Sequence, residues 1–480
     1  MIFRSMDEFR AAGFKPHVII IGAGPAGITV ALRLAKSKIP CVILDAGGKE
    51  MTEDSQDFYK GKVIGDPYFE LEMARLRCLG GTSGHWAGWC RPLDAHDFAV
   101  RDWVPNSGWP VDHEAVAAHM DVTREILGLA QFEPDAPLSD AINWVDLIRS
   151  EPVVRFGDKY RAELEASPLI AVVLNTYATD LKAVGARVTD INLMSTGKPS
   201  GSISAEKVVV ATGGIENSRL LLWSNQVSTD PVVPEAKALG RYWMEHPEFI
   251  GGDALIFEPD AFKHAQDGWA FFAPSLKAMQ DAGVMNFHVV VMPRTYSWTK
   301  QLVSDLACVA PSASEWLAAK AGSSFSCYGN QLGVAWEQAP LYDNHISLSA
   351  TETDKAGVPR VELHWRKGDL ERKTLLEGMK MFGTMFAEKN IGRVRLANWL
   401  RDGEEYPIND MMAGYHHMGG TRMSNDPKLG VVDADCRVHG MENLFVAGSS
   451  IFTTSGYANP TTTLVAFADR LGEHLALSHA

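Results

Sequence analysis

A glycine-rich turn close to the N-terminus is the strongest constraint on the fold of this chain. The continuous β-branched run 17–21 leads into the sequence GAGPAG over 22–27, and apolar residues at helical spacing follow over 28–38. Glycines at this spacing permit a tight turn and bring a phosphate close to the unsatisfied N–H groups of a helix N-terminus. The pattern predicts a strand–turn–helix unit that binds a dinucleotide. An ordinary glycine-rich turn is the weaker alternative.

A second apolar run over 41–44 predicts the next parallel strand, and Asp45 follows it directly. The interval from Gly27 to Asp45 is close to the roughly 20 residues that separate such a fingerprint from a ribose-binding acid. A carboxylate at this position favours a 2′-hydroxyl over a 2′-phosphate. These residues alone therefore leave both FAD and NAD open and argue against NADP.

Composition and charge exclude several other classes of protein. A chain of 480 residues is expected to form two or three structural domains. The net charge of −14 disfavours non-specific binding to nucleic acid or to an anionic membrane. No run of apolar residues is long enough to span a membrane, and the opening residues lack the apolar core of a signal peptide, so a cytoplasmic location is expected. Six cysteines without zinc-type spacing predict buried free thiols and no metal site: Cys41, Cys78, Cys90, Cys308, Cys327 and Cys436.

Further segments predict how the rest of the chain is organised around the nucleotide-binding unit. We expect a packed loop over 67–91, a small β-meander over 170–211, and a buried strand over 207–211 that leads into a helix over 216–224. Residues 245–412 mix strand-like runs with an amphipathic stretch over 370–389, which indicates a separate α+β region. A last strand is predicted over 443–447 and a terminal helix over 460–477.

Five segments of the chain resemble, in order, the motifs of the glucose–methanol–choline (GMC) family of FAD oxidoreductases. They read IGAGPAG over 21–27, LGGTSGHW over 79–86, ATGGIENSR over 211–219, YHHMGGTRM over 415–423, and GSS over 448–450 with YANPTT over 457–462. Weaker similarity covers 240–247 and 337–349. The pattern is most similar to the branch of the pyranose oxidases and bacterial glycoside 3-oxidases. The resemblance implies FAD rather than NAD.

The resemblance implies a fold of class α/β plus α+β. A Rossmann-like FAD-binding domain, similar to that of p-hydroxybenzoate hydroxylase, would carry an inserted substrate-binding domain built on a mostly antiparallel sheet and helices. The FAD-binding domain would be discontinuous and comprise residues 1–50, 70–95, 165–244 and 413–480. Residues 96–164 would form a connecting helical segment, and residues 245–412 would form the substrate-binding domain.

The same resemblance assigns cofactor-binding residues to each of these motifs. Ser449 stands where many FAD enzymes carry an acid, so it would bond a phosphate or a ribityl hydroxyl without charge. The full set comprises Gly22, Gly24, Pro25, Ala26, Gly27, Asp45, Ala46, Gly80, Gly81, Thr82, Ser83, His85, Trp86, Ala178, Ala211, Thr212, Gly213, Glu216, Gly448, Ser449, Asn459, Pro460 and Thr461.

A catalytic base is expected within the segment 415–423. Oxidation of an alcohol removes a proton from oxygen and a hydride from carbon, and an alcohol does not ionise unaided at neutral pH. A neutral histidine can accept that proton. The first histidine of the family motif H-x-x-G holds this role, and here it is His416. His417 would then face packing or solvent.

Three further residues carry more than one interpretation. Asn459 is implied as the partner of His416 that hydrogen-bonds the substrate oxygen, although an Asn before Pro460 is also typical of a helix N-cap. Gln338 would contact substrate, or would be an ordinary glutamine of a sheet. His85 corresponds to a histidine that is bonded covalently to the flavin in part of the branch and is not bonded in other members, so FAD attachment through His85 stays open.

These residues and the resemblance predict an FAD-dependent GMC alcohol oxidoreductase (EC 1.1.-.-). It would oxidise a secondary alcohol of a sugar, glycoside or cyclitol to a ketone, with the hydride passing to flavin N5, the proton to His416, and the electrons to O₂ or an external acceptor. The alternatives are oxidation of a primary or non-sugar alcohol, and a non-enzymatic flavin-binding escort or sensor. An NAD-dependent dehydrogenase would have no use for the C-terminal motif around Asn459. No nucleic-acid or membrane partner is predicted, and the oligomeric state stays open.

Overall fold

A six-stranded parallel sheet forms around the glycine-rich turn in the computed structural model. Its strand order is β1 (Ile2–Phe3), β7 (Ile170–Val173), β3 (Cys41–Leu44), β2 (Val18–Ile21), β11 (Lys207–Val210) and β20 (Leu444–Val446). Every residue of β2 and β3 is buried, as parallel strands covered on both faces require. The structure describes residues 1–257, 265–293, 330–408, 411–412 and 414–478, together with the single residues 262, 316 and 320.

Three helices set the geometry of this nucleotide-binding sheet. They are α2 (Pro25–Lys36), α9 (Glu216–Val227) and α15 (Thr461–Leu477), and α15 packs against α2. The predicted strand–turn–helix unit is confirmed: β2 ends at Ile21, and α2 begins directly after Gly24. Gly22 adopts a φ of +110°, and a Cβ on it would lie 2.4 Å from the carbonyl oxygen of Ala211. Only glycine allows β2 and β11 to approach so closely at their carboxyl ends.

One strand lies in a different sheet from the one expected. Residues 170–173 form β7 of the parallel sheet, whereas the antiparallel meander begins only at β8 (Thr176–Val184) and continues through β9 (Arg187–Ser195) and β10 (Lys198–Ile203). The prediction of a meander over the whole segment was therefore wrong at its first strand. A short apolar run does not reveal which sheet it joins, because its register with β3 is set by a tertiary contact.

An antiparallel sheet of eight strands forms the second large layer. Its order is β18 (Gly392–Leu396), β12 (Glu248–Ile256), β15 (Asn330–Trp336), β14 (Phe287–Pro293), β13 (Ala270–Pro274), β6 (Ile142–Val145) and β5 (Ala136–Pro137), and β19 (Met411–Met412) pairs with β12. The long helix α13 (Asp369–Glu388) packs Leu375, Met379 and Phe382 into the core of this layer. The segment expected to be a helical connector thus also contributes two strands, β5 and β6.

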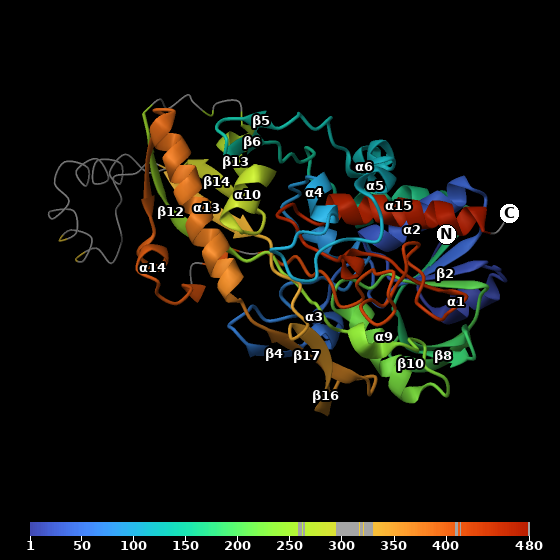
Figure 1. Ribbon diagram of the computed structural model, residues 1–480. Coiled ribbons are helices and arrows are strands. Elements are labelled where there is room, and N and C mark those ends of the chain that lie inside the picture. The colour runs from blue at the N-terminus through green and yellow to red at the C-terminus, as the bar shows by residue number, and fades with distance from the viewer. Residues whose placement is uncertain are drawn as a thin grey trace.

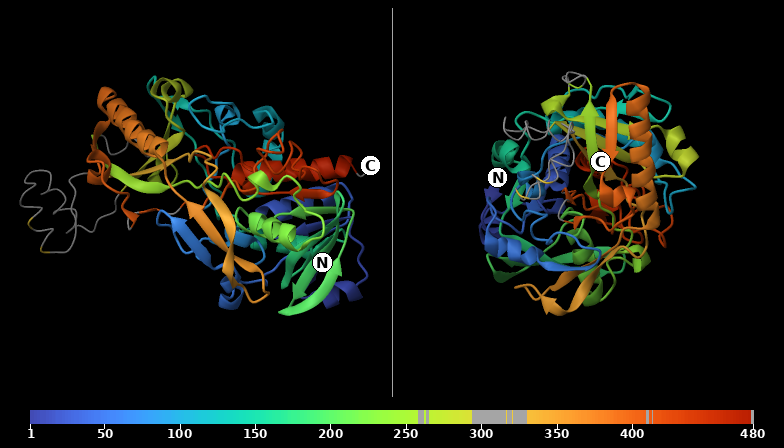
Figure 2. Two further views of the ribbon diagram at one scale, coloured as in Figure 1. Left: turned by 60° about the horizontal axis from the view of Figure 1, so that its bottom comes forward. Right: turned by 90° about the vertical axis from the view of Figure 1, so that its left-hand side faces the viewer.

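The two layers lie at opposite ends of the molecule (Figure 1). The parallel sheet, α2 and α15 lie at the end that holds both termini, and α13 lies at the other, an arrangement that the further views also show (Figure 2). A small sheet of β4 (Gly61–Gly65), β17 (Pro359–Trp365) and β16 (His345–Thr353) flanks the region between them. The fold class is the predicted one, while the division of the chain into domains stays a prediction.

The shorter helices lie mainly in the connections between these sheets. They are α1 (Met6–Ala11), α3 (Glu53–Gln56), α4 (Ala95–Phe98), α5 (His113–Ala117), α6 (Met120–Leu127), α7 (Phe156–Lys159), α8 (Arg161–Ala166), α10 (Leu276–Ala282) and α14 (Asn398–Arg401). Among the described helices, none combines the length and apolar character that crossing a bilayer demands. Cys41, Cys78, Cys90 and Cys436 are buried free thiols, as predicted, and Cys308 and Cys327 lie outside the described residues.

Candidate active site

One cavity of about 680 Å³ connects the glycine-rich turn to the histidines of the C-terminal motif. Both sheets contribute to its walls: Gly24 and Ala211 lie at the parallel sheet, and His288 and Ala335 belong to the antiparallel sheet. Almost every residue that the sequence assigns to cofactor or substrate lines this cavity. The exceptions are Gly27, Gly80 and Gln338.

The two glycines outside the lining shape the backbone behind it. A Cβ on Gly27 would lie 2.0 Å from the carbonyl oxygen of Gly22, and a Cβ on Gly80 would lie 2.2 Å from the amide nitrogen of Gly157. Both positions bring two backbone segments into direct contact. The structure therefore gives these glycines a role in forming the cofactor-side wall, not in contacting a ligand.

Gln338 lies behind the cavity, two residues after the end of β15. Its Oε1 accepts hydrogen bonds from the backbone N–H of Glu245 at 2.9 Å and from the indole N–H of Trp365 at 2.8 Å. Its Nε2 donates to the carbonyl oxygen of Arg366 at 3.1 Å, and the side chain is fully buried. The expected contact with substrate is not observed, because these bonds commit the amide to the protein.

The cofactor end of the cavity has the shape and donors that a dinucleotide requires. No protein atom lies within 4 Å of the position that a Cβ on Gly24 or Gly213 would occupy, so the space beside both glycines is left to a ligand. Helix α2 begins with Pro25 at its first position and has no side-chain cap, which leaves its first N–H groups free for an anion. The expected pyrophosphate fits this end.

Asp45 lies at the carboxyl end of β3 and faces the same end of the cavity. Its carboxylate accepts hydrogen bonds from the backbone N–H groups of Ala23 and Gly47, both at 2.8 Å. Burial raises the pKa of Asp45, while these two bonds and Arg77 act in the opposite direction. A carboxylate has about four acceptor sites, so two are left for the predicted ribose contact.

Two buried arginines on this side escape the sequence analysis. Arg75 pairs with Glu216 at 2.7 Å, and Arg77 lies over the ring of Phe58 and donates to the carbonyl oxygen of Ala46 at 3.1 Å. Burial opposes ionisation of Glu216, but Arg219 and Arg75 outweigh it and lower the pKa of this carboxyl. Glu216 thus fixes the positions of cations at the cavity wall.

His416 lies at the opposite end of the cavity, directly after Tyr415. Burial, followed by the neighbouring histidines His246, His417 and His288, holds the pKa of His416 well below its usual range, so its imidazole is neutral at pH 7. Its Nδ1 lies 3.0 Å from Nδ1 of His246. Within the described residues no hydrogen bond reaches its Nε2.

His417 faces away from the position of His416. Its Nε2 lies 3.1 Å from the hydroxyl of Tyr68, its ring lies beside the indole of Trp243, and burial lowers its pKa to about 3. Its carbonyl oxygen accepts a hydrogen bond from the Ser449 hydroxyl at 2.6 Å. Because the His417 ring is already bonded to Tyr68, His416 is the better candidate for the base. The hydrogen bond from Ser449 to the His417 carbonyl oxygen also uses the hydroxyl proton that was expected to bond the cofactor.

Asn459 lines the cavity just before the N-terminus of α15. Helix α15 has Pro460 as its N-cap and no side-chain cap, so the N-cap interpretation of Asn459 is not observed. Within the described part of the chain no hydrogen bond engages its amide, although the residue lines the cavity. The amide is therefore available to a ligand and does not cap the helix.

A buried carboxylate joins the backbones that carry the two facing histidines. Glu245 accepts hydrogen bonds from the backbone N–H of His246 at 2.8 Å and of His416 at 2.6 Å, and a third from the hydroxyl of Tyr68. Burial raises the pKa of Glu245 to about 7. Gly414 allows this contact, because a Cβ there would lie 2.2 Å from the carbonyl oxygen of His246.

The end of the cavity next to the antiparallel sheet combines a carboxyl group with aromatic rings. Glu248, the first residue of β12, lines the cavity, and burial raises its pKa to about 7. The rings of Trp89 and Trp269 stack with centroids 5.8 Å apart, and Phe271 packs against Trp89. No hydrogen bond among the described residues reaches the Glu248 carboxyl, so this end offers an unengaged carboxyl group beside an aromatic wall.

His85 lies on the loop after the short 3-10 helix η2 (Gly81–Gly84). Its side chain is exposed toward the cavity, and burial, with a smaller contribution from Arg155, lowers its pKa. Trp86 is fixed by a 2.7 Å hydrogen bond from its indole N–H to the carbonyl oxygen of Val154. A neutral imidazole thus lies beside an anchored Trp86.

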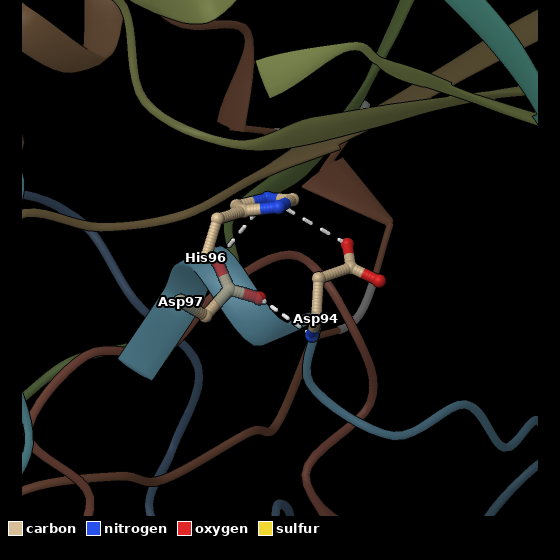
Figure 3. Close-up of side chains that lie close together, drawn as sticks. All are labelled: Asp94, His96 and Asp97. Atoms are coloured by element: carbon tan, nitrogen blue, oxygen red, sulfur yellow. Dashed lines mark hydrogen bonds and ion pairs between the residues drawn. The ribbon is translucent and has the colours of Figure 1, made fainter. Parts of the chain in front are cut away.

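A second cluster of possible ligand atoms lies outside this cavity, at Asp94, His96 and Asp97 (Figure 3). The His96 ring lies between the two carboxylates, with its Nε2 3.7 Å from Asp94 and 3.8 Å from Asp97. Arg91 pairs with Asp94 at 2.8 Å, and Asp97 accepts hydrogen bonds from Asn286 at 3.1 Å and from the Asp94 backbone at 3.0 Å. These partners account for both carboxylates, so the cluster caps α4 and gives no ground for a metal.

Comparisons with known proteins bear on the identity of this site. The family model described as GMC oxidoreductase matches residues 340–468, which include His416 and Asn459. The chain is 22% identical to the 2-methyl-1,2-propanediol dehydrogenase of Mycolicibacterium austroafricanum, over 96% of this chain and 95% of that protein. It is 26% identical to the C-glycoside 3-oxidase of Microbacterium trichothecenolyticum, over 83% of this chain and 75% of that protein. The crystal structure of the pyridoxine 4-oxidase from Mesorbium loti superimposes with a TM-score of 0.62 at 16% identity, over 97% of this chain and all of that one.

The C-terminal part of the chain, residues 340–468, is a GMC oxidoreductase domain. This domain and the oxidase and dehydrogenase relatives support FAD as the cofactor and oxidation of an alcohol as the activity class. NAD is thereby disfavoured. The site residues that no sequence motif indicated are Tyr68, Arg75, Arg77, Glu245, His246, Glu248 and His288.

Two of these residues lie in a segment that carried a weak signal in the sequence. Glu245 and His246 lie in the segment 240–247, which shows weak family similarity. The contacts of Glu245 and His246 with His416, more than 160 positions away, depend however on tertiary structure. The backbone of Tyr415 adds a further feature without a sequence signal: its φ of +53° lies in the left-handed region, next to His416.

Proposed function

We propose that this enzyme oxidises a secondary alcohol of a sugar, glycoside or cyclitol to a ketone, with His416 as the proton acceptor. The observation that carries the proposal is that a neutral imidazole and an unengaged amide, those of His416 and Asn459, face the cavity whose other end is built for a dinucleotide. FAD, when bound, accepts the hydride that leaves the carbinol carbon. The protein then has to bind, orient and deprotonate the alcohol.

His416 would take the hydroxyl proton at Nε2, the ring nitrogen that no described residue engages. A positioned general base contributes about 10²–10⁴ to the rate. Asn459 would donate a hydrogen bond from its amide to the same oxygen and so fix the orientation of the C–H bond. On the cofactor side, Gly24 and the N-terminus of α2 would hold the pyrophosphate, and Asp45 would hold the ribose.

Support for a polyhydroxylated substrate comes from the end of the cavity next to the antiparallel sheet. The Glu248 carboxyl is half-buried and has no hydrogen-bond partner among the described residues, so hydroxyl groups of a substrate would supply the hydrogen bonds that it lacks. The rings of Trp89 and Trp269 would cover the apolar face of a sugar ring. The name of one relative, C-glycoside 3-oxidase, points in the same direction.

A smaller diol is the second candidate, because the relative with 95% coverage of its own length is a 2-methyl-1,2-propanediol dehydrogenase. Anaerobic mixing of the yellow holoenzyme with a panel of sugars, glycosides, cyclitols, primary alcohols and short diols tests both. We expect flavin bleaching with members of the first three classes. Bleaching by short diols alone would contradict the proposal in favour of the second candidate.

The electron acceptor is tested on the same preparation. We expect electrons to pass to O₂ or to an external acceptor, and the yield of hydrogen peroxide per ketone formed measures the first route directly. A yield near one identifies an oxidase, whereas turnover that requires an added quinone or dye identifies a dehydrogenase. Turnover with neither would contradict the proposed reaction.

A further inference from the structure

His246 faces the proposed base through a direct contact between two imidazole rings. Its Nδ1 lies 3.0 Å from Nδ1 of His416, and the ring planes are nearly perpendicular at 84°. We propose that His246 is a positioning residue that holds His416 in the tautomer with the proton on Nδ1, so that Nε2 is free to accept a proton from substrate. This inference rests on the proposed role of His416 as the base.

The other ring nitrogen of His246 decides where its own proton lies. His246 Nε2 lies 3.2 Å from the carbonyl oxygen of Ser455, which can only accept a hydrogen bond. Nε2 must therefore carry a hydrogen. A bare Nε2 would place two acceptors against each other in a buried site, since His246 is only 1% exposed.

The charge of His246 then fixes the direction of the bond between the two rings. Burial lowers the pKa of His246 to about 4, so the ring is neutral at pH 7 and holds a single hydrogen, on Nε2. Its Nδ1 is consequently an acceptor and requires a donor from His416. That donor is the N–H at Nδ1 of His416, which leaves Nε2 of His416 with a free lone pair.

The surroundings of the pair maintain this arrangement. The nearest carboxylate, Glu245, accepts hydrogen bonds from the two backbone N–H groups and so fixes the spacing of the rings without bonding to either ring. Ser455 is itself held, because its hydroxyl accepts a hydrogen bond from the backbone N–H of Gln338 at 3.1 Å. The Ser455 carbonyl oxygen therefore determines which ring nitrogen of His246 carries the hydrogen. His246 in turn determines which ring nitrogen of His416 carries one.

The most direct test is ¹⁵N NMR of the holoenzyme labelled at its histidine ring nitrogens, with the His416 signals assigned from the spectrum of H416N. Protonated and unprotonated ring nitrogens have clearly separated ¹⁵N shifts. We expect the wild-type protein at pH 7 to show His416 with a protonated Nδ1 and an unprotonated Nε2. A protonated Nε2 on His416 would overturn the inference, while loss of flavin reduction in H416A would still support the proposed base.

Two variants of His246 separate tautomer control from simple packing. In H246N the amide oxygen takes the place of Nδ1 and still accepts from His416, so we expect the wild-type tautomer and a rate of flavin reduction within about threefold of wild type. In H246L no acceptor is left; we expect a mixture of His416 tautomers and a rate reduced about tenfold or more, with FAD still bound and KM little changed. An unchanged His416 tautomer in H246L would overturn the inference. If H246L fails to bind FAD, the inference is tested by the His416 tautomer in the wild-type protein and in H246N, and a protonated Nε2 in either would overturn it.

Discussion

At the scale of single residues, the chemistry of this enzyme depends on groups kept neutral by burial. His416 suits the proposed role of base because no carboxylate of the described residues contacts its ring to favour the protonated form; its ring partner is another neutral histidine. Asn459 complements it as a donor that cannot ionise. In the proposed reaction the pair would separate proton acceptance from substrate orientation.

Glu248 gives a prediction at this scale. E248Q keeps an acceptor but loses the charge, and a hydrogen bond to a charged group is worth about 1.5–3 kcal/mol. We expect KM for a polyhydroxylated substrate to rise about tenfold or more, with kcat changed much less. Steady-state kinetics measure both values, and E352Q, on β16, serves as the control.

The pH dependence of KM sharpens that test. Because the pKa of Glu248 is raised to about 7, the carboxyl ionises as the pH increases through 7, and KM of the wild type should decrease over that range. The same decrease should be missing in E248Q. A KM that E248Q leaves unaltered would show that Glu248 does not contact substrate.

At the scale of elements, a buried ion pair joins the segment after α4 to the end of β15. Arg101 and Glu337 form two hydrogen bonds of 2.7 and 2.5 Å, and Glu337 also accepts from the backbone of Asn286 at 3.1 Å. Both side chains are almost completely buried. This pair fixes the strand end that precedes Gln338 and, through it, the backbone of Glu245.

Removal of one partner should therefore be costly. R101M leaves the Glu337 carboxylate buried without its cation, and such changes destabilise by about 3–5 kcal/mol. We expect a large drop in the thermal midpoint of the holoenzyme, with partial recovery in the double variant R101M/E337L. Equal midpoints for R101M and wild type would show that the pair contributes nothing to stability.

The sequence predicts the elements of the nucleotide-binding sheet well and the substrate end poorly. The strands β2, β3 and β11 and the helices α2, α9 and α15 are recognisable because buried parallel strands and glycine turns have local signatures. Glu245 and His246 act through contacts with His416, about 170 residues away, and no local pattern reveals such a pairing. For the same reason Gln338 was expected at the substrate, although its bonds to Glu245 and Trp365 hold it behind the wall.

At the scale of the whole molecule, the histidines around the cavity affect stability. Burial lowers the pKa of His246 to about 4 and of His288 and His417 to about 3, from an ordinary value of 6.5, and His416 shifts in the same direction. Below pH 6.5 the unfolded chain binds these protons and the folded protein does not, so the free energy of unfolding falls with pH. Three acids act in the opposite sense, Glu245 and Glu248 with pKa values raised to about 7 and Asp97 with a pKa raised to about 6, but they are three groups against four.

The net expectation is a thermal midpoint that decreases as the pH is lowered from 6.5 to 4.5. H288F removes one of the four groups while preserving the ring contacts with Phe271 and Tyr457. Its midpoint should fall less steeply over the same range, which calorimetry at several pH values measures. Parallel curves for H288F and wild type would contradict the assignment of acid sensitivity to these histidines.

The measurement that tests the account most directly is rapid anaerobic mixing of the yellow holoenzyme with the best alcohol from the substrate panel, comparing wild type, H416A and the surface control H345A. We predict that H416A retains bound FAD and its thermal midpoint but bleaches about 10²–10⁴ times more slowly, whereas H345A bleaches like wild type. Bleaching of H416A at the wild-type rate would contradict the claim that this imidazole accepts the substrate proton.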